Sequence, residues 1–394
     1  MDFPLSLFPQ PALAPEEFEL LRQVEAAAGE FAARAAGFDL SRTFPWDNIK
    51  RINALGLNRM FLPEEVGGCP MSYAAYLACL QAVSSACAST GLIWATNFHA
   101  MSPVVDFGTD EQKRRFLTPV ADGALASLAI TETNSGSNAT GMKTRFRPMG
   151  DEIVVDGEKV FITSGDVSSV FLVFGKWTEL GDGKDAISAL VVEKGTPGFE
   201  VVRRERTMGH RASHTTALAF RGCRVPCANL LLAPGDGVRV LLAALNKSRP
   251  SVAAHALAIA RAALSDMVDY ARERVVGGKR LIEHQANRFT IAELAAELAM
   301  CEAMLWNVAS RVSAGATDIG LASAALKLRA GDLAVRTAME AIQFQGGYGY
   351  LEDNRAERLL RDAKLMQIGE GAAEALKDFI GGAFMTERTG KAAA

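Results

Sequence analysis

The apolar pattern of this chain changes twice, and these two changes most constrain the fold that it can adopt. From Pro15 to about Val120, apolar residues recur three and four positions apart, as on one face of a helix. Between about Gly123 and Pro234 the pattern becomes short β-branched or alternating runs separated by turn residues, which is typical of antiparallel strands. From Val238 onward the helical period returns.

These stretches predict a multi-domain α+β protein, because 394 residues exceed what one small core organises. The expected units are an N-terminal α-helical domain (1–122), a middle antiparallel β-domain (123–235) and a C-terminal four-helix bundle (236–394). In the bundle we expect long helices at 249–274, 281–314 and 319–344, followed by a terminal one. Pro250 is expected in the first turn of the first of these helices, with Ser248 as its cap.

Composition excludes several classes of protein. A net charge of −3 offers no electrostatic footprint for nucleic acid. Residues 1–11 lack the basic and apolar regions of a secretory signal, and no apolar run approaches the ~20 residues of a membrane span. The six cysteines are scattered, which favours free thiols in a reducing compartment, and no second pair completes a zinc site with Cys223 and Cys227. We expect a cytoplasmic protein without a metal.

The strongest candidate for chemistry is Glu370, which stands between Gly369 and Gly371 just before a helical pattern. Flanking glycines remove side-chain cover and allow a ligand to approach the backbone. Such a carboxylate suits a general base, because it can reach the proton of a bound substrate. The alternative is a solvated acid near a helix N-terminus, where negative charge is mildly favourable.

The segment from Gln343 to Ala372 resembles the C-terminal signature of the acyl-CoA dehydrogenase family, in which an aromatic-Glu-Gly-Thr loop carries the catalytic base. The acid and the following glycine are present here, whereas Gly369 and Ala372 replace the aromatic residue and the threonine. The helix–strand–helix order matches the family along essentially the whole chain. The resemblance implies FAD-dependent α,β-dehydrogenation of an acyl-CoA thioester. Glu370 would abstract the α-proton, and a hydride would pass to flavin N5.

A hydroxyl-rich stretch, Ala129 to Asn138, suits a polar ring or a phosphate, although such stretches are commonly just loops. It resembles the flavin-contacting segment of the family. The resemblance implies that Ile130 and Thr131 contact the flavin and that Ser137 lies where flavin and acyl-CoA meet. Asn138 replaces an acid of the family pattern.

A strand-like run, Lys159 to Gly165, resembles the family segment Trp-Ile-Thr-Asn-Gly. The resemblance implies that Phe161 packs on the isoalloxazine and that Ile162 and Thr163 border it, with Thr163 bonding the N5 edge. Phenylalanine keeps the apolar face of the family tryptophan and loses its indole donor.

The run from Met208 to Thr216 resembles a third family segment, in which His214 stands for an acid and Thr216 for an arginine. These departures would alter CoA contacts or the choice of acyl group. For His210 and His214 we expect ordinary polar contacts and no catalytic role.

The resemblance also assigns substrate contacts to Ser137, Asn246, Arg249 and Gly371. Arg249 matches a family arginine that faces the active site. Some relatives carry the catalytic acid at the position of Ser248, so a hydroxyl there leaves Glu370 as the sole candidate.

A second set of residues would bind FAD of a neighbouring subunit, which implies a homodimer or homotetramer. Arg274 and Gln285 would reach the pyrophosphate and adenosine, since a guanidinium forms paired charged bonds to phosphate. Gln343, Gly346 and Gly347 would complete that site. Ala372 and Glu374 are also assigned to the cofactor, although Ala372 lacks the family hydroxyl, and Gly277 replaces a phenylalanine.

The expected electron acceptor is an electron-transfer flavoprotein or a similar partner. Two alternatives stay open: a flavin-dependent oxidase or monooxygenase on the same fold, and a non-catalytic helical interaction protein. Acyl chain length depends on cavity-lining side chains that the sequence does not identify.

Overall fold

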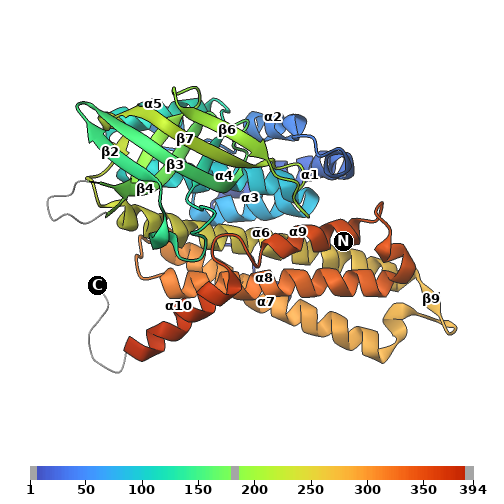
Figure 1. The fold of residues 1–394 in the computed structure, drawn as a ribbon. Helices are drawn as coiled ribbons and strands as arrows, with labels where there is room; N and C mark the ends of the chain where they lie inside the picture. Colours follow the sequence, from blue (N-terminus) through green and yellow to red (C-terminus); the bar gives the residue numbers. More distant parts are fainter. Residues whose placement is uncertain (1–6, 179–185, 387–394) are drawn as a thin grey trace.

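The computed structural model describes residues 7–178 and 186–386. Figure 1 shows the three expected regions in chain order, with helices first, then strands, then long helices. The first region contains α1 (Pro15–Ser41), α2 (Trp46–Ala54), α3 (Tyr73–Ala86), α4 (Ala88–Phe107) and α5 (Asp110–Ala121). The predicted multi-domain α+β fold is confirmed.

Helix α4 was not delimited by its sequence. It is buried along nearly its whole length and therefore shows no amphipathic period. The break from α3 is a single extended residue, Cys87, at φ −148°. In contrast, the start of α5 is well defined, because Thr109 and Gln112 exchange the two hydrogen bonds of a capping box.

The middle region forms one sheet in the order β6-β7-β3-β2-β4-β5-β8, with β1 paired to β4. Most pairings are antiparallel, as expected, but β4 is parallel to both β1 and β2. The strand-like run that begins at Lys159 is the second half of the long strand β3. The strands are β1 (Ala126–Ala129), β2 (Arg145–Met149), β3 (Glu152–Thr163), β4 (Val170–Trp177), β5 (Ala186–Glu193), β6 (Phe199–Arg204), β7 (Thr215–Pro226) and β8 (Leu230–Leu231).

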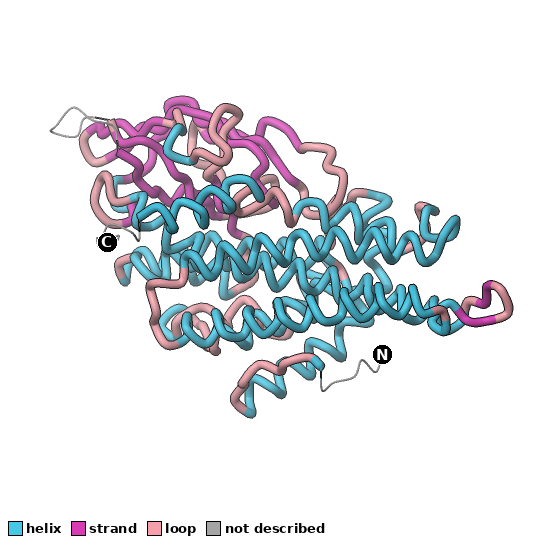
Figure 2. The backbone as a smooth tube through the Cα atoms, turned by 90° about the horizontal axis from the view of Figure 1, so that it is seen from below, coloured by secondary structure: helices cyan, strands magenta, loops and turns pink. Residues whose placement is uncertain are grey.

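The last region is built on three long helices that pack against one another, with α9 on two of them. Figure 2 shows these helices running alongside one another and a small hairpin projecting from one end. The helices are α6 (Gly237–Glu273), α7 (Gln285–Ser313), α8 (Gly320–Gln345), α9 (Arg355–Leu365) and α10 (Ala373–Thr386), and the hairpin strands are β9 (Val275–Val276) and β10 (Lys279–Arg280). Short 3-10 turns are η2 (Glu64–Val66), η3 (Ala139–Gly141), η4 (Cys227–Asn229), η5 (Leu281–Glu283) and η6 (Gly346–Tyr350).

The predicted start of the first long helix is wrong. Helix α6 begins at Gly237, so Pro250 lies inside it and Ser248 is not a cap. A proline inside a helix cannot donate to the carbonyl four residues earlier, here that of Asn246. The Ser323 hydroxyl of α8 donates to that carbonyl oxygen instead, at 3.4 Å. A contact from another helix thus replaces the missing backbone bond.

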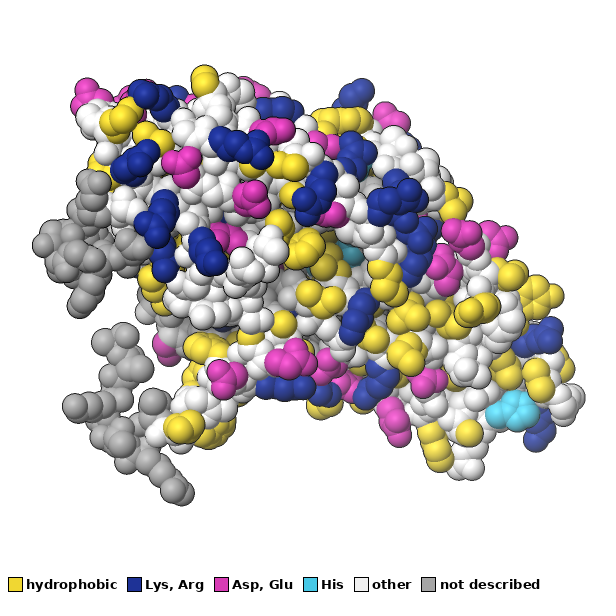
Figure 3. Space-filling model, in the orientation of Figure 1, with side chains coloured by type: hydrophobic (Ala, Val, Ile, Leu, Met, Phe, Trp, Pro, Cys, Tyr) yellow, Lys and Arg dark blue, Asp and Glu magenta, His cyan; other side chains and the backbone are white. Residues whose placement is uncertain are grey.

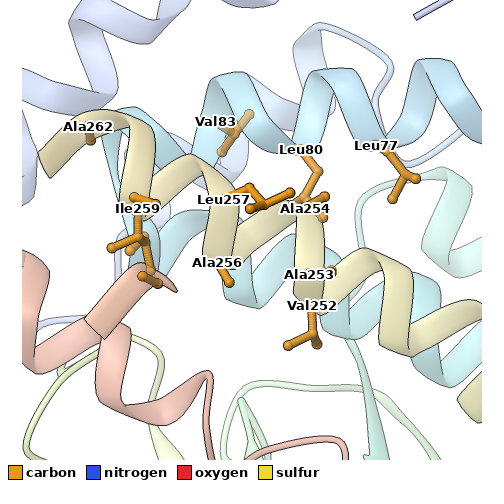
Figure 4. Packing of buried hydrophobic residues seen from close by; sticks show 14 of the residues in the cluster. Leu77, Leu80, Val83, Val252, Ala253, Ala254, Ala256, Leu257, Ile259 and Ala262 are labelled. Atoms are coloured by element: carbon orange, nitrogen blue, oxygen red, sulfur yellow. The ribbon is translucent and has the colours of Figure 1, made fainter. Parts of the chain in front are cut away.

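Helix α6 is the centre of the apolar core. Figure 4 shows α3 alongside α6, with Leu80 of α3 beside Ala254 and Leu257 of α6. By length and composition α6 could cross a membrane, but 83% of its most apolar window is buried within the molecule. Packing against its neighbours therefore accounts for its apolarity.

Candidate active site

Glu370 lies in the tight loop between α9 and α10 and adopts a left-handed backbone conformation, with φ +55°. The next residue, Gly371, has φ +107°, and a side chain there would lie 3.0 Å from Leu376. The loop is closed by a hydrogen bond from the Ala373 N–H to the Gln367 carbonyl oxygen, at 3.1 Å. Because Glu370 and Gly371 are both left-handed, the backbone turns sharply at the glutamate. This conformation is strained for a residue other than glycine.

The Glu370 carboxylate is hydrogen-bonded by α6. The buried Ser248 hydroxyl donates to Glu370 Oε2 at 2.6 Å. The position expected to cap a helix thus contacts the candidate base. Among the described residues the backbone N–H of Glu370 has no hydrogen-bond partner, so it remains available to a ligand.

Two cations lie beside this carboxylate. Arg249 packs over the Phe379 ring at 5.5 Å, and its buried Nε has no partner among the described residues. Lys327 of α8 donates from Nζ to the Gly371 carbonyl oxygen at 2.5 Å. Burial lowers the pKa of Lys327 to about 8 and also lowers the pKa of Arg249, while attraction to Glu370 opposes both changes. Lys327 was not identified from the sequence, where it occupies one turn of a long helical pattern.

Of the predicted substrate contacts, Arg249 and Gly371 lie close to Glu370. Asn246 and Arg249 stand on either side of Ser248, and Gly371 follows the glutamate. The Asn246 side-chain oxygen also lies near the start of α8, where a Cβ on Gly320 would be 3.3 Å away. Ser137 lies in the middle region, in the exposed loop after β1.

A buried polar cluster adjoins the site one helical turn along α6. The Ser251 hydroxyl bonds His99 Nε2 at 2.9 Å and the Tyr76 hydroxyl at 2.8 Å. Burial lowers the pKa of His99, and attraction to Glu370 opposes this change. Phe98 packs on Tyr76 with ring centroids 4.3 Å apart. The sequence did not reveal this cluster, because a single histidine in the apolar α4 carries no distinctive signal.

Phe161 projects from a bulge in β3. The pairing of β3 with β7 shifts register between Lys159 and Ile162, and Phe161 has φ +60°. Its side chain is 67% exposed, which is high for a large apolar residue, whereas Ile162 is buried in the sheet core. Thr163 is half-buried, and its carbonyl oxygen accepts a bond from Ser127. The bulge therefore presents an aromatic face.

The loop after β1 is fixed to β3 by a buried ion pair. Lys159 Nζ contacts Glu132 Oε1 at 2.7 Å and donates to the Ile130 carbonyl oxygen at 2.8 Å. The Val160 N–H donates to the Thr131 carbonyl oxygen at 2.9 Å. This anchor places Ile130 and Thr131 beside the strand that carries Phe161. The alternating pattern of the strand did not indicate that Lys159 would form a buried ion pair.

These features fit a flavin. The exposed Phe161 ring can stack on a planar heterocycle, and the adjoining threonines and backbone groups can bond its polar edge. Figure 3 shows hydrophobic side chains gathered along the boundary between the strands and the helical bundle.

The third sequence segment joins the sheet region to the bundle. The backbone of Gly209 packs so closely on α9 that a Cβ there would lie 2.2 Å from the Arg361 carbonyl oxygen. His210 Nε2 meets His255 Nε2 of α6 at 2.9 Å, and burial lowers the pKa of both imidazoles. His214 bonds Asp166 at 2.9 Å. Both histidines make structural contacts, as expected.

The second set of predicted cofactor residues lies elsewhere. Arg274 ends α6, about 37 Å along the helix from Arg249 at 1.5 Å per residue. Gln285 begins α7 beside the same hairpin, and Gln343 with Gly346 ends α8. The exposed members of this set are Arg274, Gln285, Gln343, Gly346 and Gly347. The chain does not bring them to its own Glu370.

Ala372 and Glu374 lie close to Glu370 in sequence and flank the start of α10. The Ala372 carbonyl oxygen accepts the Leu376 N–H at 3.0 Å, and the Glu374 side chain is exposed.

Known proteins share this architecture over nearly the whole chain. Family models match for the acyl-CoA dehydrogenase N-terminal domain (15–124), middle domain (127–223) and C-terminal domain (235–385). The probable acyl-CoA dehydrogenase YngJ of Bacillus subtilis is 38% identical, covering 91% of this chain and 95% of that protein.

Two solved structures extend the comparison. Butyryl-CoA dehydrogenase from Megasphaera elsdenii superposes with a TM-score of 0.90 at 30% identity, covering 98% of this chain and 100% of that one. A glutaryl-CoA dehydrogenase from Mycobacterium smegmatis in complex with FADH2 gives a TM-score of 0.88 at 25% identity, covering 97% and 96%. With the site described above, these matches show that the chain belongs to the acyl-CoA dehydrogenase family and is an FAD-dependent oxidoreductase acting on acyl-CoA.

Proposed function

We propose that the chain catalyses α,β-dehydrogenation of an acyl-CoA thioester with Glu370 as the base that removes the α-proton. The observation that carries this proposal is the placement of Glu370. Its left-handed loop presents the carboxylate, and Ser248 orients it through the 2.6 Å hydrogen bond. A base must lie within hydrogen-bond reach of the proton that it takes, and an oriented carboxylate meets that need.

Removing the α-proton places negative charge on the thioester carbonyl oxygen. The Glu370 N–H, which has no partner among the described residues, is suited to bind that oxygen. Arg249 and Lys327 add positive charge to the same region. When bound, FAD supplies at its N5 atom the acceptor for the hydride that leaves the β-carbon.

We propose that Phe161, Ile162 and Thr163 border the flavin together with Ile130, Thr131 and Ser137. The bulge and the Lys159–Glu132 anchor support this assignment. The second set, led by Arg274, would serve the FAD of a neighbouring protomer, because it lies far along α6 from Arg249. The assembly would then be a homodimer or homotetramer that passes electrons to an electron-transfer flavoprotein or similar acceptor.

The test is an anaerobic titration of the FAD-loaded protein with a panel of acyl-CoAs, following flavin absorbance. Glu370→Gln is expected to keep bound FAD and to lose bleaching by at least ~100-fold, since a positioned general base contributes about 10²–10⁴. Asp378→Asn, at an exposed position on α10, is the matched control and should bleach normally. Unchanged bleaching in Glu370→Gln would refute the base assignment. Rapid oxygen consumption during turnover would instead identify an oxidase or monooxygenase.

A further inference from the structure

Lys327 is a buried cation whose hydrogen bond to the Glu370 loop has no part in the reaction as proposed. Its side chain is 1% exposed, and its ammonium donates to the Gly371 carbonyl oxygen at 2.5 Å. Among the described residues no carboxylate lies within ion-pair distance of it. Burying a charge without an ion-pair partner is costly, so the position calls for an explanation.

Two further contacts join α8 to the Glu370 loop. A Cβ on Gly331 would lie 2.6 Å from the Met366 carbonyl oxygen, so the loop backbone packs directly on the helix. Asp332 accepts a hydrogen bond from the Gln367 side chain at 2.8 Å. Lys327 is one turn before Gly331, so one side of α8 touches the loop from its beginning to the residue after Glu370.

Lys327 makes its contact at the strained part of the loop. Glu370 and Gly371 have φ +55° and +107°, and the bonded carbonyl belongs to the second of them. Rotation of that peptide would release the left-handed pair and move the carboxylate away from Ser248. A charged donor resists this rotation more strongly than a neutral one, because charge-assisted hydrogen bonds are roughly twice as strong.

We propose that Lys327 is a positioning residue for the reaction, which tethers the Gly371 carbonyl so that Glu370 keeps its carboxylate on Ser248 and its N–H toward the substrate. This inference rests on the proposed role of Glu370. The charged groups that act on Lys327 are Glu370 in the loop, Arg249 on α6 and Asp332 on α8 itself.

The experiment compares Lys327→Met, which removes the donor, with Lys327→Gln, which keeps a neutral donor. Removing the tether should lower the rate of flavin bleaching by about 10- to 100-fold, with smaller loss in the glutamine variant. The ratio of FAD to protein should not change. Hydrogen–deuterium exchange of the peptide covering 366–372 should become faster, because that loop loses its contact with α8.

Thr337→Val is the matched control on α8. Thr337 is equally buried, and its hydroxyl donates to the Leu333 carbonyl oxygen within the same helix. This variant should bleach and exchange like the parent protein. A general loosening of α8 would affect all three variants alike, whereas loss of the tether would affect only those at Lys327.

The parent protein provides a test that requires no variant. Burial lowers the pKa of Lys327 to about 8, so the bleaching rate is expected to fall as pH rises above that value and the tether loses its charge. The Lys327→Gln protein should lack this decrease. A parent rate that stays flat to pH 9.5, or a Lys327→Met protein with the parent rate and exchange, would overturn the inference. Retained bleaching in Glu370→Gln would defeat the proposed function, whereas an inactive Glu370→Gln beside fully active Lys327 variants would defeat only this inference.

Discussion

At the scale of single residues, the site depends on a short contact between α6 and the loop before α10. The Ser248 hydroxyl and one Glu370 carboxylate oxygen lie 2.6 Å apart, at the short end of O–H···O bonds. Glycines on both sides of Glu370 are a local signal, so sequence reasoning could propose this residue as the base. It misjudged Ser248, because only tertiary packing brings the middle of α6 to the loop.

Ser248→Ala should slow reduction by the acyl-CoA without releasing FAD. A hydrogen bond to a charged group contributes about 1.5–3 kcal/mol, so the rate should fall by about 10- to 100-fold. Stopped-flow measurement of flavin bleaching gives this rate. Ser85→Ala, at a half-buried position on α3, serves as the control and should leave it unchanged. Equal rates in the two variants would show that the hydroxyl does not orient the base.

At the scale of elements, the β3 bulge and the ion pair beneath it place the aromatic face of Phe161. Lys159 is fully buried, and Glu132 is 7% exposed. The strand pattern predicted β3 but not the bulge, because period-two alternation does not encode the paired strand's register. Nor did it predict the length of α6, whose proline is tolerated because Ser323 bonds the freed carbonyl.

Glu132→Gln should destabilise the protein strongly, because it leaves the Lys159 ammonium buried without its partner. Breaking a buried ion pair costs about 3–5 kcal/mol, whereas the double variant Glu132→Gln with Lys159→Met should recover part of the loss. Urea unfolding and the FAD-to-protein ratio measure the effect.

The exposed pair of Arg224 and Glu152 offers the contrast for that experiment, with side chains 58% and 42% accessible. Glu152→Gln should change the free energy of unfolding by less than about 1 kcal/mol. If Glu132→Gln costs no more than Glu152→Gln, the buried pair does not hold the loop.

At the scale of the whole molecule, the sheet region meets the bundle through His210 and His255. Burial lowers the pKa of both imidazoles below the value of about 6.5 that the unfolded chain has. As pH falls through that value the unfolded chain binds protons first, so stability decreases on acidification. The Asp362 carboxyl, whose pKa burial raises, contributes with the opposite sign.

The urea midpoint should therefore fall between pH 7.5 and pH 5.5, and fall less steeply in His255→Gln. That variant loses the bonds to His210 and Ser84, so it should already be less stable at pH 7.5. Parallel curves for the two proteins would show that His255 does not account for the acid sensitivity.

The separation of Arg249 from Arg274 along α6 permits a complementation test. Glu370→Gln subunits and Arg274→Ala subunits should each be inactive or poor in FAD by themselves. Co-expressed, they should form some sites with an intact loop from one chain and an intact Arg274 from the other, so part of the bleaching should return. If the co-expressed subunits bleach no faster than either variant alone, the Glu370 loop and Arg274 do not serve the same site.

The length of α6 has a thermodynamic consequence. If α6 carries Arg249 to the site of its own subunit and Arg274 to the site of the neighbouring subunit, FAD binding depends on subunit association. Retention of FAD is then linked to subunit concentration by mass action. Diluting the holoprotein should then release FAD and dissociate the assembly over the same concentration range.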